Sequence, residues 1–199
     1  MAHEGLWEQL DKLDRQKTAK RAKCQYLGEP ERYVIVLLNT EYVVKLSDKA
    51  ILSEQSGSAP VAAEFLKQLC VLAYLINAQD LPLANKLARP ETLPGGQFFF
   101  RGQHQLPTEE LESAFGEYPE RLYKIAEKFD AKRCEFGDAS IELYVLPRIP
   151  LTIVIWRSDE EFGARASILF DQTAASHLPL DALSAAVNLA VEALVKEPE

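Results

Sequence analysis

The six residues from Leu151 to Trp156 constrain the fold most, because they are almost entirely apolar and rich in β-branched side chains. Such a run favours a strand, and a strand without polar alternation is covered on both faces. We therefore place it at the centre of a sheet. The preceding run, Ile141 to Leu146, alternates apolar and polar residues, which is typical of a strand with one covered face.

Other short runs predict the remaining strands. Tyr33 to Leu38 and Tyr42 to Leu46 are rich in β-branched and aromatic residues and stand three residues apart, which predicts a hairpin. Ala166 to Phe170 predicts another strand, after a charged turn at Ser158 to Gly163. The prolines of Pro147 to Pro150 predict a turn, because proline cannot donate to a central ladder.

Apolar residues at helical spacing predict five helices. They cover residues 4–26, Val61 to Asn77, Thr108 to Phe115, Pro119 to Phe129, and Leu180 to the C-terminus. The second of them has so wide an apolar face that we expect it to be buried on more than one side.

Helices and strands are mixed but segregated along the chain, so the predicted fold class is α+β: an antiparallel sheet packed with helices, with N-terminal and C-terminal helices. A length of 199 residues favours a single α+β domain, residues 1–199, with residues 4–26 as a possible helical appendage. Polar or proline-rich stretches at Ser53 to Pro60 and Leu81 to Gly96 predict irregular connections.

The charge balance limits the partners. A net charge of −8 argues against nucleic acid and against anionic membrane surfaces, which both attract clustered Lys and Arg. No apolar run is long enough to cross a bilayer. Cys24, Cys70 and Cys134 form no C-x-x-C pair, and no signal peptide is visible, so we expect a cytoplasmic protein. A protein partner or a homo-oligomer is compatible with this composition.

The segment Leu93 to His104 combines a Gly-Gly pair, three phenylalanines, an arginine and a histidine. In one interpretation the glycines shape a turn, the phenylalanines enter the core, and Arg101 pairs with a local carboxylate. In the other, backbone amides and Arg101 hold an anionic ligand while a phenylalanine packs against its flat part. Three consecutive aromatics in an extended chain cannot all face one core, so we expect at least one to point elsewhere. The candidate ligand-binding residues here are Gly95, Gly96, Gln97, Phe99, Arg101 and His104.

Two histidines, His104 and His177, each precede a Leu-Pro pair that predicts a helix start. The positive end of a helix dipole disfavours a charged imidazole, so we expect both rings to be neutral. A neutral ring suits proton transfer or metal binding, but it equally suits a histidine with only a backbone partner. No histidine pair has the spacing of a metal motif, and we assign no metal site.

Carboxylates cluster in the charged turn at Asp159, Glu160 and Glu161, and Asp171 follows the next predicted strand. Clustered carboxylates can bind hard cations or act as general acid and base, although acid-rich hairpin turns are also common. Asp159, Glu160, Asp171 and His177 complete the candidate site, and the sequence identifies no cofactor.

Several segments, taken together, match a known pattern. They are Leu93 to His104, Phe136 to Ala139, Val145 to Leu151, Trp156 with Asp159 to Phe162, and Ile168 to Asp171 running on to His177-Leu178-Pro179. From about Trp7 to the C-terminal helix the chain resembles the uncharacterised family called domain of unknown function 3786. The resemblance implies a bacterial or archaeal origin, often an anaerobe, and in some members an added cysteine-rich iron–sulfur domain. This chain has no closely spaced cysteines, and the family supplies no catalytic residues.

Two functional hypotheses follow. The first is a cytosolic binding or accessory protein, serving anaerobic metabolism, with a small anionic or cofactor-like ligand at Gly95 to His104. The second is an enzyme for a small anionic substrate, with His104 or His177 as acid/base, Arg101 as anion clamp, and Asp159 or Glu160 assisting. The lack of a complete catalytic motif favours the first. A cleft that joins Arg101, His104, Asp171 and His177 would favour the second.

Overall fold

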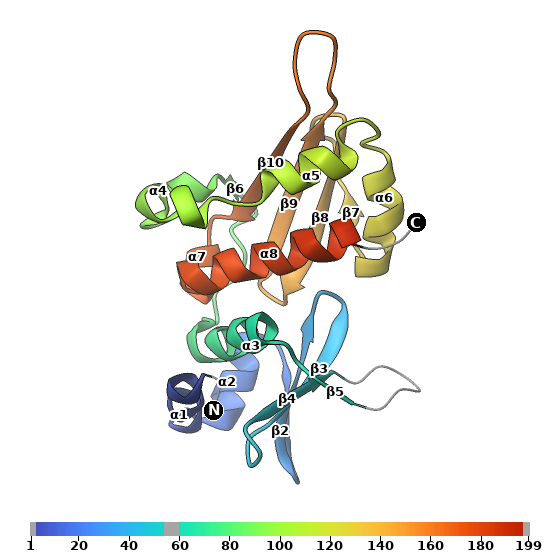
Figure 1. Ribbon diagram of the computed structural model, residues 1–199. Helices are drawn as coiled ribbons and strands as arrows, with labels where there is room; N and C mark the ends of the chain where they lie inside the picture. The colour runs from blue at the N-terminus through green and yellow to red at the C-terminus, as the bar shows by residue number, and fades with distance from the viewer. Residues whose placement is uncertain (1–2, 54–59, 197–199) are drawn as a thin grey trace.

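A computed structural model describes residues 3–53 and 60–196, and these form two antiparallel sheets with a pair of helices between them (Figure 1). This arrangement confirms the predicted α+β class, with two sheets where one was expected. The polar loop expected over Ser53 to Pro60 lies almost entirely outside the described residues.

The first sheet is a meander in which consecutive strands are neighbours. Its strands are β1 (Gln25–Gly28), β2 (Glu31–Leu37), β3 (Thr40–Lys45), β4 (Ala50–Ser53) and β5 (Val61–Ala62). The predicted hairpin is confirmed as β2 and β3. Leu38 and Asn39 turn between them with φ of 48° and 58°, the pair of left-handed residues that a tight hairpin with the right twist requires.

The N-terminal prediction is partly wrong. Residues 4–26 form two helices, α1 (Glu4–Asp11) and α2 (Arg15–Ala22), and the chain then enters β1. Asp14 separates the helices because its carboxylate caps α2 by accepting the Lys17 N–H at 2.8 Å. Trp7 and Leu10 of α1 are buried against the rest of the structure. Pairing with β2 outweighs the weak helical pattern of the residues after Lys23.

The second sheet has the order β6-β10-β9-β8-β7. Its strands are β6 (Leu87–Ala88), β7 (Lys132–Arg133), β8 (Ala139–Leu146), β9 (Ile149–Trp156) and β10 (Arg165–Asp171). The prediction of a central strand is confirmed, because β9 lies between β8 and β10 and all its residues except Trp156 are buried.

The turn predicted over Pro147 to Pro150 is shorter than expected, since β9 already begins at Ile149. Pro150 fits in a central strand because it lies outside the stretch paired with β10, which ends at Leu151 and Phe170. Its missing N–H therefore removes no bond from that ladder. On the other side it pairs with Tyr144, next to a β-bulge.

Two long helices, α3 (Phe65–Asn77) and α8 (Leu180–Lys196), pack against each other between the sheets. Figure 1 shows α8 and α5 (Thr108–Phe115) crossing the same face of the second sheet, with α6 (Arg121–Ala126) beside them. The helices predicted at Thr108, Pro119 and Leu180 are confirmed. The helix predicted from Val61 begins four residues later, because Val61 and Ala62 form β5.

The two sheets meet where the Leu38 N–H donates to the Val145 carbonyl oxygen at 3.0 Å. Buried apolar residues of both sheets, α3 and α8 belong to one continuous cluster. Within the described residues, no helix combines the length and the apolar character needed to cross a membrane.

Candidate functional site

The Gly-aromatic segment forms a short helix, α4 (Gly96–Phe99), instead of an extended run. Gly95 begins it with a φ of 78°, a conformation that favours glycine. A Cβ at Gly96 would stand 2.0 Å from the carbonyl oxygen of Pro90, so the backbone approaches the 3₁₀ turn η1 (Pro90–Thr92) too closely for any side chain. The two glycines are explained by this turn and this contact.

The helical turn distributes the three phenylalanines over different environments. Phe100 is buried and its ring packs 6.0 Å from that of Phe170, whereas Phe98 is 75% exposed. Phe99 is half-buried and stacks on His104, with ring centroids 4.4 Å apart and an interplanar angle of 19°. The expectation that one aromatic points away from the core is confirmed in Phe98.

Gln97, Arg101 and His104 are exposed. His104 ends the 3₁₀ turn η2 (Gly102–His104), and its ring stacks on that of Phe99. Within the described residues, no ion pair or side-chain hydrogen bond holds the Arg101 guanidinium. The segment therefore presents the Arg101 and His104 side chains to solvent.

His177 ends α7 (Ala174–His177) and is fully buried. Its Nδ1 accepts the Gln79 backbone N–H at 3.3 Å, which leaves Nε2 as the protonated nitrogen, without a hydrogen-bond partner among the described residues. Burial lowers the pKa of His177, and the positive charges of Arg148 and Lys23 lower it further against the opposing charge of Asp171. A neutral ring is thus favoured, as in the structural interpretation of this histidine.

Asp171 ends β10 and is 5% exposed. Its Oδ1 accepts three hydrogen bonds, from the Ala84 N–H at 3.1 Å, the Thr173 N–H at 2.9 Å and the Thr173 hydroxyl at 2.6 Å. Burial alone would raise the pKa of this carboxyl, but the hydrogen bonds outweigh it and hold the pKa below its usual value. Asp171 therefore fixes the loop before β6 and the start of α7.

Asp159 and Glu160 lie in the hairpin between β9 and β10, which projects beyond the sheet away from α4 and α7 (Figure 1). Asp159 Oδ1 accepts the Phe162 N–H at 2.7 Å and the Glu161 N–H at 2.9 Å, and these bonds lower its pKa. This carboxylate closes its own turn. The structure separates these acids from Arg101 and His104.

A buried polar centre forms around Arg148, a residue that the sequence indicated only as part of a turn. The guanidinium is 4% exposed and donates to the Arg21 carbonyl at 2.7 Å, the Leu81 carbonyl at 2.6 Å and Asp80 Oδ1 at 2.9 Å. Lys20 pairs with the other oxygen of Asp80 at 3.3 Å. This Arg148 centre ties the β8–β9 turn to α2 and to the chain after α3. The feature of the sequence that indicates this burial is the position of Arg148 between two apolar residues, Pro147 and Ile149.

A groove of about 410 Å³ lies beside the aromatic segment, and we call it the edge groove. It is lined by Arg89, Pro90, Glu91, Phe100, Gln105, Leu106, Thr108, Ala166, Ser167, Ile168 and Leu169. Of the candidate segment only Phe100 reaches it. Arg89 is exposed, and within the described residues it forms no ion pair.

The floor of the edge groove is a stretch of β10 that has no neighbouring strand on that side. The short strand β6 pairs only with Phe170 and Asp171, and the Ala166 N–H donates instead to Glu112 Oε1 at 2.9 Å. Backbone groups two residues apart on a strand point the same way, so the Ile168 N–H also faces the groove. The groove thus offers a backbone donor and a guanidinium over an apolar base.

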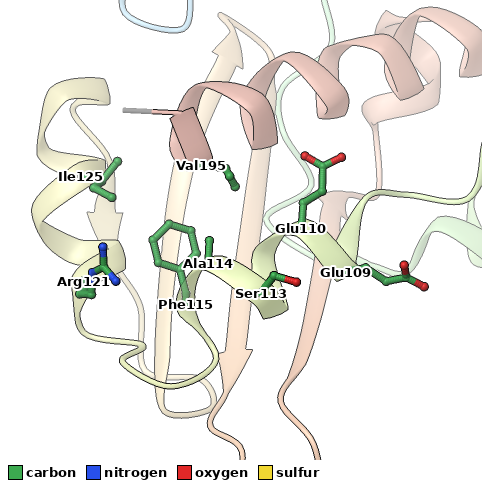
Figure 2. A pocket seen from close by; sticks show the side chains of 8 residues that line it. All are labelled: Glu109, Glu110, Ser113, Ala114, Phe115, Arg121, Ile125 and Val195. Atoms are coloured by element: carbon green, nitrogen blue, oxygen red, sulfur yellow. The ribbon is translucent and has the colours of Figure 1, made fainter. Parts of the chain in front are cut away.

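A larger hollow of about 670 Å³ lies between α5, α6 and the end of α8 (Figure 2). Figure 2 shows Phe115 and Ile125 facing its interior, Glu110 directed toward α8, and Glu109 turned away. Its charged residues are two glutamates and Arg121. This acidic balance does not suit the anionic ligand expected from the sequence.

Together, the sheets and the edge groove define an α+β protein with an accessible strand edge and a cationic side chain above it. The chain belongs to the family described as domain of unknown function (DUF3786), whose model matches residues 14–193. The family predicted from the sequence resemblance is confirmed, with the matched region beginning at Asp14. No curated protein and no solved structure matches the chain.

Proposed function

We propose that this protein is a non-catalytic binding protein that holds a small anionic ligand in the edge groove. The observation that carries the proposal is that Arg89 and the Ile168 N–H face the same groove without a partner in the described part of the chain. An arginine fork and a backbone N–H are the donors that proteins most often direct at carboxylates and phosphates.

The start of α5 also favours an anion in the edge groove. Thr108 opens the helix and lines the groove, and Pro107 before it supplies no side-chain cap. The Thr108 N–H donates to the Leu106 carbonyl oxygen at 2.8 Å, and the N–H groups of the next two residues of α5 keep capacity for an external acceptor. Glu91 also lines the groove and opposes a highly charged anion, so we favour a ligand with one or two negative charges.

The arrangement of the remaining candidates supports binding more than catalysis. His177 and Asp171 are buried and engaged, whereas Arg101 and His104 are exposed at the start and the end of η2. No hydrogen bond, ion pair or ring contact joins the first pair to the second in the part of the chain described. The catalytic alternative would need all four in one cleft.

The expected location stays the cytoplasm. All three cysteines are free thiols in the structure, which suits a reducing compartment.

The test is isothermal titration calorimetry with inorganic phosphate and with succinate, on the wild type and on Arg89→Gln. We expect Arg89→Gln to weaken binding by about tenfold or more, because the fork is the main charged donor of the groove. Arg101→Gln is the matched control, since it removes the same charge from the neighbouring turn η2. Binding that depends on Arg101 and not on Arg89 would move the ligand to η2. If neither anion binds, the proposal is contradicted.

A further inference from the structure

A third cavity, of about 230 Å³, lies on the face of the second sheet that α8 does not cover. We call it the outer-face cavity. Its floor includes Glu142 of β8 and Thr152 of β9, and its walls include Leu83, Leu87 and Phe136. It shares no lining residue with the edge groove.

Two polar side chains in this cavity stand side by side without a partner. Glu142 and Thr152 are directly opposite each other in the β8–β9 register, so both point to the same face. Thr152 is only 3% exposed, yet its hydroxyl makes no hydrogen bond within the described residues. Glu142 is half-buried and likewise makes no hydrogen bond or ion pair there. Among the described residues, the fully buried polar side-chain atoms without a partner are Trp7 Nε1 and His177 Nε2. The Thr152 hydroxyl and the Glu142 carboxylate therefore open onto the cavity, where a ligand can reach them.

Two lysines lie near Glu142 without forming an ion pair with it in the described part of the chain. Lys132 of β7 is its register partner on the other side, and Lys86 lines the cavity, but neither forms an ion pair with it. Asp171 adds a second carboxylate to the lining. The charge of Glu142 contributes to raising the pKa of the Cys134 thiol and of the Tyr144 hydroxyl, after burial. The lining thus holds two carboxylates against one lysine ammonium, that of Lys86.

We infer that the outer-face cavity binds a small primary ammonium ion with a short apolar body. An ammonium group has three N–H donors and no acceptor, which matches a carboxylate beside a hydroxyl oxygen. The leucines and Phe136 suit the apolar body. A metal ion fits less well, because no group of three metal-ligating side chains gathers among the described residues.

Cys134 provides a direct reporter, because its half-buried thiol lines the cavity. Cys24 and Cys70 serve as internal references, since burial raises the pKa of each to about 12 and slows their reaction. The experiment follows the rate of Cys134 reaction with Ellman's reagent at increasing n-butylammonium chloride, with sodium chloride at equal ionic strength as the blank. Isothermal titration calorimetry with the same salt measures the affinity.

We expect n-butylammonium to slow the reaction of Cys134 and n-butanol at the same concentration to leave it unchanged. Glu142→Gln should weaken n-butylammonium binding at least tenfold, and Thr152→Val should weaken it several-fold. Glu161→Gln removes one charge from the exposed hairpin and should bind like the wild type. Thermal unfolding verifies that each variant folds. If Glu142→Gln fails to fold, the binding of n-butylammonium by Thr152→Val decides the question.

Three results would overturn the inference: no protection of Cys134, equal protection by n-butanol, or unchanged binding in Glu142→Gln. Because the outer-face cavity and the edge groove share no lining residue, none of these outcomes bears on the anion in the edge groove.

Discussion

The Arg148 centre and the edge groove both place an arginine next to a proline, but they use it in opposite ways. Arg148 donates to two carbonyls and Asp80 and is almost fully buried. Arg89 is exposed above an open strand edge and has no ion pair within the described residues. The difference teaches that an arginine beside a proline stabilises the fold where backbone carbonyls accept its hydrogen bonds. Where no carbonyl accepts them, the guanidinium is available to a ligand.

The largest effect that separates the two regions is expected for Arg148→Met. The change leaves the Arg21 and Leu81 carbonyls without a hydrogen-bond donor. The loss of the ion pair costs less at Asp80, because its half-exposed carboxylate can be hydrated by water. We expect a loss of about 3 kcal/mol in the free energy of unfolding, measured by urea denaturation. Arg89→Met is the matched control and should change it by less than about 0.5 kcal/mol. A similar loss of unfolding free energy in Arg148→Met and Arg89→Met would show that the two arginines do not differ in their structural role.

Gly96→Ala is expected to have the next largest effect, because it alters the support of the edge groove. The added methyl would overlap the Pro90 carbonyl oxygen, so η1 must shift, and Arg89 precedes η1 directly. We expect a destabilisation of about 2 kcal/mol together with weaker phosphate binding. Gly163→Ala, in the hairpin, has open space for a methyl and serves as the control. A variant of normal stability and affinity would show that the contact is not needed.

The pH dependence of stability should show a smaller effect, caused by His177, whose pKa is lowered first by burial and then by the charge of Arg148. Because the pKa of His177 is lowered in the folded state, the unfolded chain binds the proton more readily. The stability that the neutral His177 ring contributes is fully present above about pH 6.5. It decreases as the pH falls toward the lowered pKa, by at most about 1.4 kcal/mol per pH unit.

Urea denaturation between pH 5 and 7.5 tests this dependence. His177→Gln should flatten the profile in that window, whereas His104→Gln, at the exposed histidine, should keep the wild-type slope. Identical slopes in the wild type and His177→Gln would contradict the assignment.

The parts of the fold that the sequence predicted correctly are those with a strong local signal. The central strand, the β2–β3 hairpin and α8 each carry their periodicity within one segment. The strand β1 was missed because it depends on pairing with β2, and the second sheet could not be separated from the first without knowing which strands meet.

The candidate site was harder to predict for the same reason. His104 and His177 precede the same Leu-Pro pattern, and both patterns do start helices, at Thr108 and Leu180. Yet one ring stacks on an exposed segment and the other is fully buried. Burial and hydrogen bonding by Arg148 likewise depend on residues far away in the chain, which local spacing does not encode.

The bonds of Arg148 also set an order of events during protein synthesis. They join residues 127 and 67 positions apart, to Arg21 and Leu81. At roughly 5–20 residues per second, the ribosome adds Arg148 about 6–25 s after Arg21. The first sheet and α3 are complete well before that, but two of the carbonyls that anchor them still lack their donor. We expect the nascent N-terminal half to acquire its final packing only when the β8–β9 turn has emerged.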